Sequence, residues 1–416
     1  MRYLDASIIM VNDTGYATGG ASTVALAEAV DLHKRGENVT FLCAAGPVAS
    51  ELTQVGVPVI CLGQQEISSD DNRWRASVQG LWNVRAATAL TKLLNNVPDG
   101  RAVVHIHSWS KALSSSVVRA AVGKVPMVLT LHDYFVACPN GGFYDYSTRR
   151  HCPAVAMSKG CIWRNCDRRG LSHKGYRILR QLVQRDLGGI PAQIDDYIYL
   201  SEFSLEHLRP YLPEGARLHF LPNPMTASPR SPVPVQDNKA FLYVGRLSPE
   251  KGVQLFVEAA RIAQVQTLVV GSGEEQPLIR AANPEAELTG WLSGEELERV
   301  YDRARALVLP SRLYETFGLV VVEAAMRGVP AIVSDGCAAR DLVINGETGL
   351  WFRDGDIFDL AMKLKRLEEE KELASRLGRN SWERYWRNPL DIRHHTEKLL
   401  KIYEQTLSVK KYLINH

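Results

Sequence analysis

Long apolar runs are missing from this sequence of 416 residues. No uninterrupted apolar stretch reaches the ~18 residues that a bilayer-spanning helix needs. The first residues run directly into Ala6-Ser7-Ile8-Ile9-Met10-Val11, which predicts a core strand rather than a signal peptide. We therefore expect a cytoplasmic protein, with peripheral contact at the cytoplasmic face of a membrane as the one form of membrane association left open.

A strong excess of one charge and short tandem repeats are also missing. The formal net charge is only +3, which is too small to indicate general nucleic-acid binding, so no nucleic-acid partner is expected. The chain is 45% hydrophobic and 23% charged, as in globular proteins of two or three domains.

Apolar, β-branched runs alternate with helical patterns through both halves of the chain. Strands are predicted at Ile8–Val11 and Val103–Ile106 in the first half, and a long helix is predicted over Val78–Leu94. Continuous apolar strands that alternate with helices indicate parallel sheets covered on both faces. The pattern occurs twice, which predicts an α/β protein of two doubly wound domains.

A proline-rich stretch after Asn223 marks the expected boundary, because four prolines within eleven residues break regular structure. We expect an N-terminal domain over 1–221, a hinge over 222–238 and a C-terminal domain over 239–388. Residues 389–416 form a helical tail, with Leu399, Leu400 and Tyr403 at helical spacing. Its apolar face must pack on one of the domains.

The run from Tyr314 to Ala325 carries two carboxylates eight positions apart, Glu315 and Glu323. The segment predicts a loop after a strand, then a buried helix that begins after Gly318. Free N–H groups at a helix start attract anions. A carboxylate beside such a site is suited to neutral hydroxyls, which suggests a phosphate-linked sugar. The alternative is a core helix with a capping acid.

Two cations lie at another predicted strand end, where ligands bind in open α/β folds. Gly245-Arg246 ends a buried strand, and Lys251 follows in the first turn of the next helix. Arg246 and Lys251 could neutralise a diphosphate, although either could equally be a surface charge. The turn at Gly271 and Gly273 would let a backbone approach a ligand, although a plain turn explains it as well.

The first half supplies a parallel set of residues. Gly19 and Gly20 join the first strand to a helix and leave room for a ligand. His107 and His132-Asp133 follow two later strands, and we expect both histidines to face a cleft between the domains. His105, on the same strand as His107, is better explained as an interior histidine.

In their order and spacing, these motifs resemble the retaining GT-B glycosyltransferases of family 4 (group 1 type), including bacterial surface-polysaccharide members with a cysteine-bearing insert. The motifs are Gly245-Arg246, Lys251, Gly271-Ser272-Gly273, Glu315-Thr316-Phe317-Gly318 and Glu323, with Gly19-Gly20 and His132-Asp133 before them. The resemblance covers almost the whole chain and is weakest over 138–180 and in the tail. It implies two Rossmann-like domains that face each other across a cleft.

The resemblance also implies roles for these residues. His132, Glu315, Arg246 and Lys251 would be catalytic, with Arg246 and Lys251 on the diphosphate of a UDP- or GDP-sugar. Glu323 would bind the ribose hydroxyls. The donor-binding set implied in this way is Gly19, Gly20, Gly245, Arg246, Lys251, Gly271, Gly273, Trp291, Leu292, Glu315, Phe317, Gly318, Leu319 and Glu323. The last helix would cross back onto the first domain.

Retention at the sugar would proceed through an oxocarbenium-like state while the diphosphate leaves. Fixed cations and helix N-termini can stabilise that leaving group, so no cofactor is expected for catalysis. Asp354-Gly355-Asp356 has a metal-binding form, but Asp356 precedes a predicted helix and is better explained as its N-cap.

Four of the seven cysteines fall close together: Cys138, Cys152, Cys161 and Cys166. In a reducing compartment, thiols at this density suit a structural zinc ion better than disulfides. The spacing lacks two close Cys-x-x-Cys pairs. Free packing thiols, an iron–sulfur cluster and disulfides therefore stay open beside zinc.

The insert that contains these cysteines, at about 134–180, opens a basic stretch. Over 138–186, ten Lys and Arg residues face three Asp residues, a balance of +7. With His107, Asp133, Arg149 and Arg150 on the acceptor side, this stretch suits a glycan or lipid-linked acceptor that carries negative charge, or an acidic membrane surface. A solvated charged face is the alternative.

Two other functions share these features. A non-hydrolysing sugar-nucleotide epimerase has the same fold, but it would need acids and a histidine placed for proton abstraction. A non-catalytic scaffold or partner protein would not need Glu315, Arg246, Lys251 and His132 together. We therefore expect a nucleotide-sugar-dependent hexosyl- or related transferase in the biosynthesis of surface polysaccharide or glycoconjugates.

Overall fold

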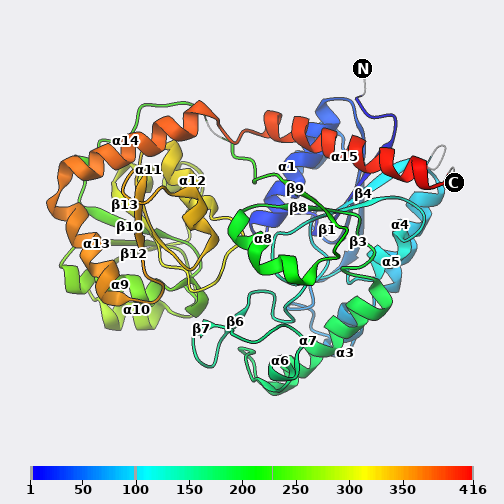
Figure 1. The fold of residues 1–416 in the computed structure, drawn as a ribbon, viewed down its shortest axis with the longest axis horizontal. Coiled ribbons are helices and arrows are strands. Elements are labelled where there is room, and N and C mark those ends of the chain that lie inside the picture. The colour runs from blue at the N-terminus through cyan, green and yellow to red at the C-terminus, as the bar shows by residue number, and fades with distance from the viewer. Residues whose placement is uncertain (1–2, 98–100, 227, 415–416) are drawn as a thin grey trace.

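The computed structural model describes residues 3–97, 101–226 and 228–414, and it consists of two lobes that lie side by side (Figure 1). Each lobe is built on one parallel sheet with helices on its faces. The predicted α/β class with two doubly wound domains is confirmed. Residue 227 of the expected hinge and the last two residues of the tail lie outside the described residues.

The N-terminal lobe has a seven-stranded sheet in the order β3-β2-β1-β4-β5-β8-β9. All its strand pairs are parallel, and β1 and β4 are buried along almost their whole length, as the apolar runs predicted. The strands are β1 (Ser7–Thr14), β2 (Asn38–Ala45), β3 (Val59–Gln64), β4 (Ala102–Ile106), β5 (Met127–Thr130), β8 (Asp196–Tyr199) and β9 (Arg217–Phe220).

Helices of this lobe differ from the prediction in one place. The expected helix over Val78–Leu94 is two helices, because Trp82 is extended and the Asn83 side chain caps a new helix by accepting from the N–H of Ala86. The helical segments are α1 (Gly20–Lys34), α2 (Ser50–Val55), α3 (Arg73–Leu81), α4 (Val84–Asn95), α5 (Ser116–Ala121), α7 (Leu171–Val183), η2 (Gln184–Gly188), α8 (Glu202–Leu208) and η3 (Arg209–Tyr211).

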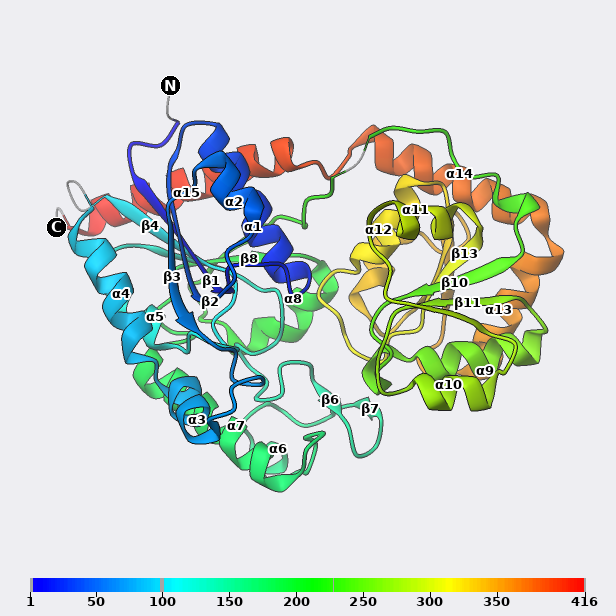
Figure 2. The same cartoon turned by 180° about the vertical axis from the view of Figure 1, so that it is seen from behind.

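The cysteine-bearing insert lies below the N-terminal sheet and reaches toward the other lobe (Figures 1 and 2). It contains the antiparallel pair β6 (Tyr144–Asp145) and β7 (Arg150–His151), the short helix α6 (Lys159–Trp163), and α7. His151 Nε2 lies 3.4 Å from Asp354 Oδ2 of the C-terminal lobe, and Arg168 pairs with Glu274 there. The insert therefore touches both lobes.

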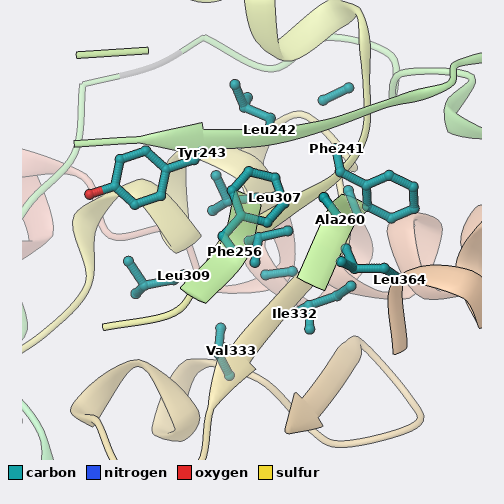
Figure 3. Packing of buried hydrophobic residues seen from close by; sticks show 14 of the residues in the cluster. Phe241, Leu242, Tyr243, Phe256, Ala260, Leu307, Leu309, Ile332, Val333 and Leu364 are labelled. Carbon is teal, nitrogen blue, oxygen red and sulfur yellow. The ribbon is translucent and has the colours of Figure 1, made fainter. Parts of the chain in front are cut away.

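The C-terminal lobe has a six-stranded parallel sheet in the order β12-β11-β10-β13-β14-β15. Figure 3 shows its core, where Phe256 and Leu364 from the covering helices pack on Leu307 and Ile332 of the sheet. The strands are β10 (Ala240–Val244), β11 (Thr267–Val270), β12 (Glu287–Gly290), β13 (Ala304–Leu309), β14 (Ala331–Ser334) and β15 (Gly349–Phe352). The helical segments are η4 (Val235–Asp237), η5 (Pro249–Lys251), α9 (Val253–Ala263), α10 (Gln276–Ala282), α11 (Gly294–Asp302), α12 (Leu319–Met326), η6 (Ala338–Leu342), α13 (Ile357–Glu369) and α14 (Lys371–Arg387).

The chain passes between the lobes twice. It leaves the first lobe after β9 and returns after α14, and α15 (Ile392–Ile414) then lies along the N-terminal lobe (Figure 2). Leu399, Leu400 and Tyr403 of α15 belong to the same apolar cluster as Ile8 and Met10 of β1. No helix among the described residues is long and apolar enough to cross a membrane.

Candidate active site

A lysine–carboxylate pair lies at the carboxyl ends of the neighbouring strands β10 and β13. Lys251 Nζ is 2.7 Å from Glu315 Oε1, and the Ser311 hydroxyl donates to the same oxygen at 2.7 Å. Burial raises the pKa of Glu315, but the charge and hydrogen bond of Lys251 outweigh it and leave the pKa below its usual value. Glu315 is thus a fixed carboxylate. An ammonium has three N–H donors, so Lys251 can also contact a ligand.

The loop after Glu315 leads to the start of helix α12. Glu315 and Gly318 have positive φ angles of 53° and 115°, and Gly318 is the N-cap of α12. A Cβ at Gly318 would lie only 2.9 Å from Ala339 Cβ, so the turn needs glycine. Phe317 is buried and anchors the loop. The N–H groups of the first turn of α12 form an anion-attracting site.

Glu323 and Arg246 lie on two further segments of the C-terminal lobe. Glu323 lies within α12, accepts a hydrogen bond from the Tyr301 hydroxyl at 2.8 Å, and has a pKa raised by burial. The Arg246 side chain is 65% exposed and reaches the buried Glu250 at 3.2 Å. Arg246 is thus free to turn toward a ligand, with Glu250 as its partner in this structure.

The predicted donor glycines are explained in part by loop packing. A Cβ at Gly271 would lie 1.9 Å from the carbonyl oxygen of Gly245, and one at Gly273 would lie 2.2 Å from that of Leu247. The loops after β10 and β11 therefore pack together only if these positions are glycine. Trp291, by contrast, follows β12 and is 70% exposed, while Leu292 packs on the core of the lobe.

The N-terminal lobe brings His132 and Gly20 to the Glu315 loop. Thr316 Oγ1 donates to the backbone oxygen of His132 at 3.0 Å. A Cβ at Gly20 would lie 3.1 Å from Leu319 Cδ1, so Gly20 and its neighbour Gly19, the N-cap of α1, approach the start of α12. The residues predicted from the two halves of the sequence therefore meet at one place between the lobes.

Behind His132 lies a line of buried ionisable groups. His132 Nε2 is 3.0 Å from His107 Nδ1, and His107 Nε2 is 3.3 Å from Glu28 Oε2 of α1. Burial, and then the charge of His107, lower the pKa of His132 to about 3, so the ring is neutral near pH 7. The expectation that His107 faces the cleft is wrong. It is 1% exposed and lies between the His132 ring and the Glu28 carboxylate.

Glu28 also binds histidines from two other elements. His395 of α15 places Nε2 2.9 Å from Glu28 Oε1 and Nδ1 3.0 Å from the Pro222 carbonyl oxygen. His105 is interior, as expected, with its ring nitrogens on the Tyr403 and Thr130 hydroxyls. Burial raises the pKa of Glu28, but the surrounding histidines hold it well below its usual value. The Glu28 carboxylate therefore anchors the histidines behind His132.

The other three residues predicted on the acceptor side, Asp133, Arg149 and Arg150, lie in different environments. Asp133 caps its own loop by accepting from the N–H of Phe135 at 2.9 Å, and burial raises its pKa to about 6. Arg149 does not face the N-terminal lobe. It reaches Gln254 at 3.1 Å and Glu275 at 3.4 Å, because the β6–β7 turn extends over the C-terminal lobe. Arg150 is exposed on β7.

Comparison with known proteins decides the family. Residues 19–224 match the family model for the glycosyl transferase 4-like domain, and residues 225–384 match that for glycosyl transferases group 1. The chain is a group 1 glycosyltransferase of family 4. Its two lobes are the two Rossmann-like domains of the GT-B fold, as the resemblance implied.

Relatives of this glycosyltransferase act in different settings. It is 29% identical over 358 residues to a glycogen synthase of Mycobacterium tuberculosis. This alignment covers 81% of this chain and 78% of the relative. It is 29% identical over 158 residues to the alpha-D-kanosaminyltransferase of Streptomyces kanamyceticus, but this match spans only 41% of that relative. Anabaena HepE in complex with UDP has the same fold, with a TM-score of 0.66, 15% identity, and coverage of 96% of this chain and 100% of its own.

The cysteines of the glycosyltransferase insert do not fit a tetrahedral zinc site as they are placed. Ligand sulfurs on zinc lie ~4 Å apart. Within the described ranges, the ligand atoms of three or more His, Cys, Asp or Glu residues come within 4.8 Å of one another only at Glu28, His105 and His107. Instead, buried Lys174 donates toward Cys166 Sγ at 3.1 Å and Cys161 Sγ at 3.7 Å. Zinc binding by Cys138, Cys152, Cys161 and Cys166 stays a prediction that requires Lys174 to move.

Sequence reasoning missed three groups that hold the site of this glycosyltransferase together. Ser311 and Tyr301 each bind one of the two predicted glutamates, and nothing in their local sequence marks them out. Glu28 had a usable signal. It stands in Ala25-Leu26-Ala27-Glu28-Ala29-Val30, where a carboxylate among apolar residues needs a buried partner.

Proposed function

We propose that this glycosyltransferase moves a sugar from a nucleotide diphosphate donor to a glycan or lipid-linked acceptor, with retention of configuration and without a catalytic metal. The donor is a UDP- or GDP-sugar. The reaction belongs to the biosynthesis of surface polysaccharide or glycoconjugates, at the cytoplasmic face of the membrane. Family membership supports the class of reaction, and the UDP named with HepE supports the class of donor.

The observation that carries the proposal is the meeting of the two lobes around Thr316. The same loop presents Glu315 with its partner Lys251 on one side and the backbone of His132 on the other. A nucleotide sugar held by the C-terminal lobe would place its diphosphate near Lys251 and the first turn of α12. Its sugar would then lie beside Glu315 and His132.

These groups suit the departure of a diphosphate. The Lys251 ammonium and the N–H groups of α12 are fixed before the reaction, so they can stabilise charge that develops on the leaving oxygen. Arg246, whose side chain is 65% exposed, can add a second cation. Glu315 and neutral His132 can bind sugar hydroxyls, while Glu323 accepts from the ribose. In a retaining transfer the leaving phosphate takes the proton of the acceptor.

A panel of UDP- and GDP-sugars, each offered with glycan and lipid-linked acceptors, tests the reaction. We expect a glycosylated product with the anomeric configuration of the donor, as determined by NMR coupling constants. An inverted product would contradict retention. An epimerised donor without transfer would show that the chain is an isomerase of the same fold.

Removal of divalent metal tests the second part of the proposal. We expect initial rates of transfer to be unchanged after dialysis against EDTA, because the proposed charge stabilisation comes from Lys251, Arg246 and the start of α12. Rates with added Mg²⁺ or Mn²⁺ serve as the control. Complete loss of transfer that Mg²⁺ restores would overturn the metal-free mechanism.

A further inference from the structure

A second group of cations surrounds a cavity of about 420 Å³ in the N-terminal lobe. The cavity lies between α3, α7 and the loop after β4, and its volume is in the range of ligand sites. No Asp or Glu is among the described residues that line it. The cations of its lining are Arg73, Lys111, Arg169, Arg177 and Arg180.

Most of this positive charge has no carboxylate partner. Arg177 pairs with Asp167 at 2.7 Å. Arg180 donates to the Ser110 carbonyl oxygen at 3.0 Å and lies 4.9 Å from the centre of the Phe135 ring, so its contacts are neutral. Burial, and then the charge of Arg177, lower the pKa of Arg180 to about 10.

The other three cations are exposed and available. Arg73 donates to the carbonyl oxygens of Ile67 at 2.8 Å and Asp70 at 3.3 Å, which are uncharged acceptors. The side chains of Lys111 and Arg169 make no hydrogen bond or ion pair with any part of the chain that the structure describes. Their charges are therefore free for a ligand.

The cavity is fixed to the same sheet edge as His132. Asp13, at the end of β1, accepts from the backbone N–H groups of Lys111, Ala112 and Leu113 at 2.8–2.9 Å, which uses its carboxylate to hold the loop. The positive charges of Lys111 and Arg180 both act to lower the pKa of the carboxyl group of Asp133, the residue next to His132, against the larger effect of burial. A ligand that binds these cations thus lies on the acceptor side of the proposed reaction.

We propose that this cavity binds the phosphate or diphosphate group of the sugar acceptor, with Lys111 and Arg169 as its main contacts. The inference rests on the proposed function, whose acceptor it specifies. Guanidinium forks and an ammonium match the oxygens of a phosphate in charge and geometry. A neutral glycan would leave four of these cations, Arg73, Lys111, Arg169 and Arg180, close together without an ion-pair partner among the described residues. The cations of α7 come from the basic stretch seen in the sequence, whereas Arg73 and Lys111 come from segments far from it.

Binding of inorganic pyrophosphate to the full chain tests the site without any transfer. Because Lys251 could also bind this probe, calorimetric titrations use Lys251→Ala protein as the background. Adding Lys111→Ala and Arg169→Ala is expected to weaken the affinity for pyrophosphate about tenfold or more, since two charge-assisted contacts are lost. The matched control adds Lys92→Ala and Arg119→Ala, two exposed cations of the same lobe outside the cavity, and should leave the affinity unchanged. Equal affinities in all three proteins would overturn the proposal.

Kinetics then identify the source of the phosphate. In the Lys111→Ala, Arg169→Ala enzyme with Lys251 intact, KM for a diphosphate-linked sugar acceptor should rise about tenfold or more, while KM for the donor stays the same. Sedimentation with phosphatidylglycerol vesicles is the second arm. Loss of vesicle binding with unchanged pyrophosphate affinity would assign the cations to membrane headgroups and overturn the acceptor site. If no donor supports transfer, the proposed function fails, whereas the pyrophosphate titration still decides the site.

Discussion

Replacing Lys251 with alanine is expected to lower kcat for sugar transfer about 100-fold or more, because removal of one preorganised donor to a developing oxyanion has an effect of this size. Lys251 binds Glu315 at 2.7 Å, in the loop that leads to α12. The substitution should act mainly on kcat rather than on KM for the donor, because charge on the diphosphate increases as the bond breaks.

The same substitution is also expected to affect folding. Its side chain is 22% exposed and its partner Glu315 is 15% exposed, so Lys251→Ala leaves a nearly buried carboxylate without its cation. The variant should therefore be assayed well below its melting temperature. Lys239→Ala, an exposed lysine before β10, is the matched control. Normal turnover in folded Lys251→Ala protein would rule out its role at the leaving group.

Replacing Glu28 with glutamine is expected to lower the free energy of unfolding by about 3–5 kcal/mol, the usual cost of removing one partner from a buried ionic network. Glu28 is 2% exposed and lies between His107, His105 and His395, so an amide of the same shape removes the charge that these rings share. Urea denaturation measures the change. Glu206→Gln, on the exposed side of α8, should change stability by less than about 0.5 kcal/mol.

The pH dependence of stability provides an independent readout of the same network. The pKa values of His105 and His132 lie below the ordinary value, so the unfolded chain takes up protons that the folded chain refuses. Each such histidine makes stability fall by up to about 1.4 kcal/mol per pH unit once the pH drops below ~6.5. Glu28, whose pKa is also low, adds a further loss only below about pH 4.3, where the unfolded chain binds a proton that the folded carboxylate does not. Stability that stays flat between pH 7 and pH 5 would contradict this network.

Strand patterns and motifs were sufficient to predict the two parallel sheets and the residues that meet between them. The strand ends could be read from the apolar runs, and ligands gather at such ends in open α/β folds. Glu315, Lys251, His132 and Gly20 are each within one loop of a strand end, so their approach to one another followed from the fold.

Contacts between distant elements could not be predicted in this way. His107 has the same sequence signal as His132, yet it lies behind that residue because the Glu28 carboxylate holds it inside the lobe. Arg149 belongs to a basic stretch, but the β6–β7 turn carries it to Glu275 of the other lobe. Periodicity within one segment does not show which partner a side chain will meet.

The return of α15 to the N-terminal lobe has a consequence for folding during synthesis. Leu399, Leu400 and Tyr403 complete an apolar cluster that begins with Ile8 and Met10, and His395 supplies one partner of Glu28. The four residues of α15, Leu399, Leu400, Tyr403 and His395, are made only after the whole C-terminal lobe. The N-terminal lobe leaves the ribosome first, but part of its apolar core stays exposed until α15 has been synthesised. This differs from the common case, in which domains fold in the order of their synthesis. The C-terminal lobe, whose core is closed within 235–377, can finish first.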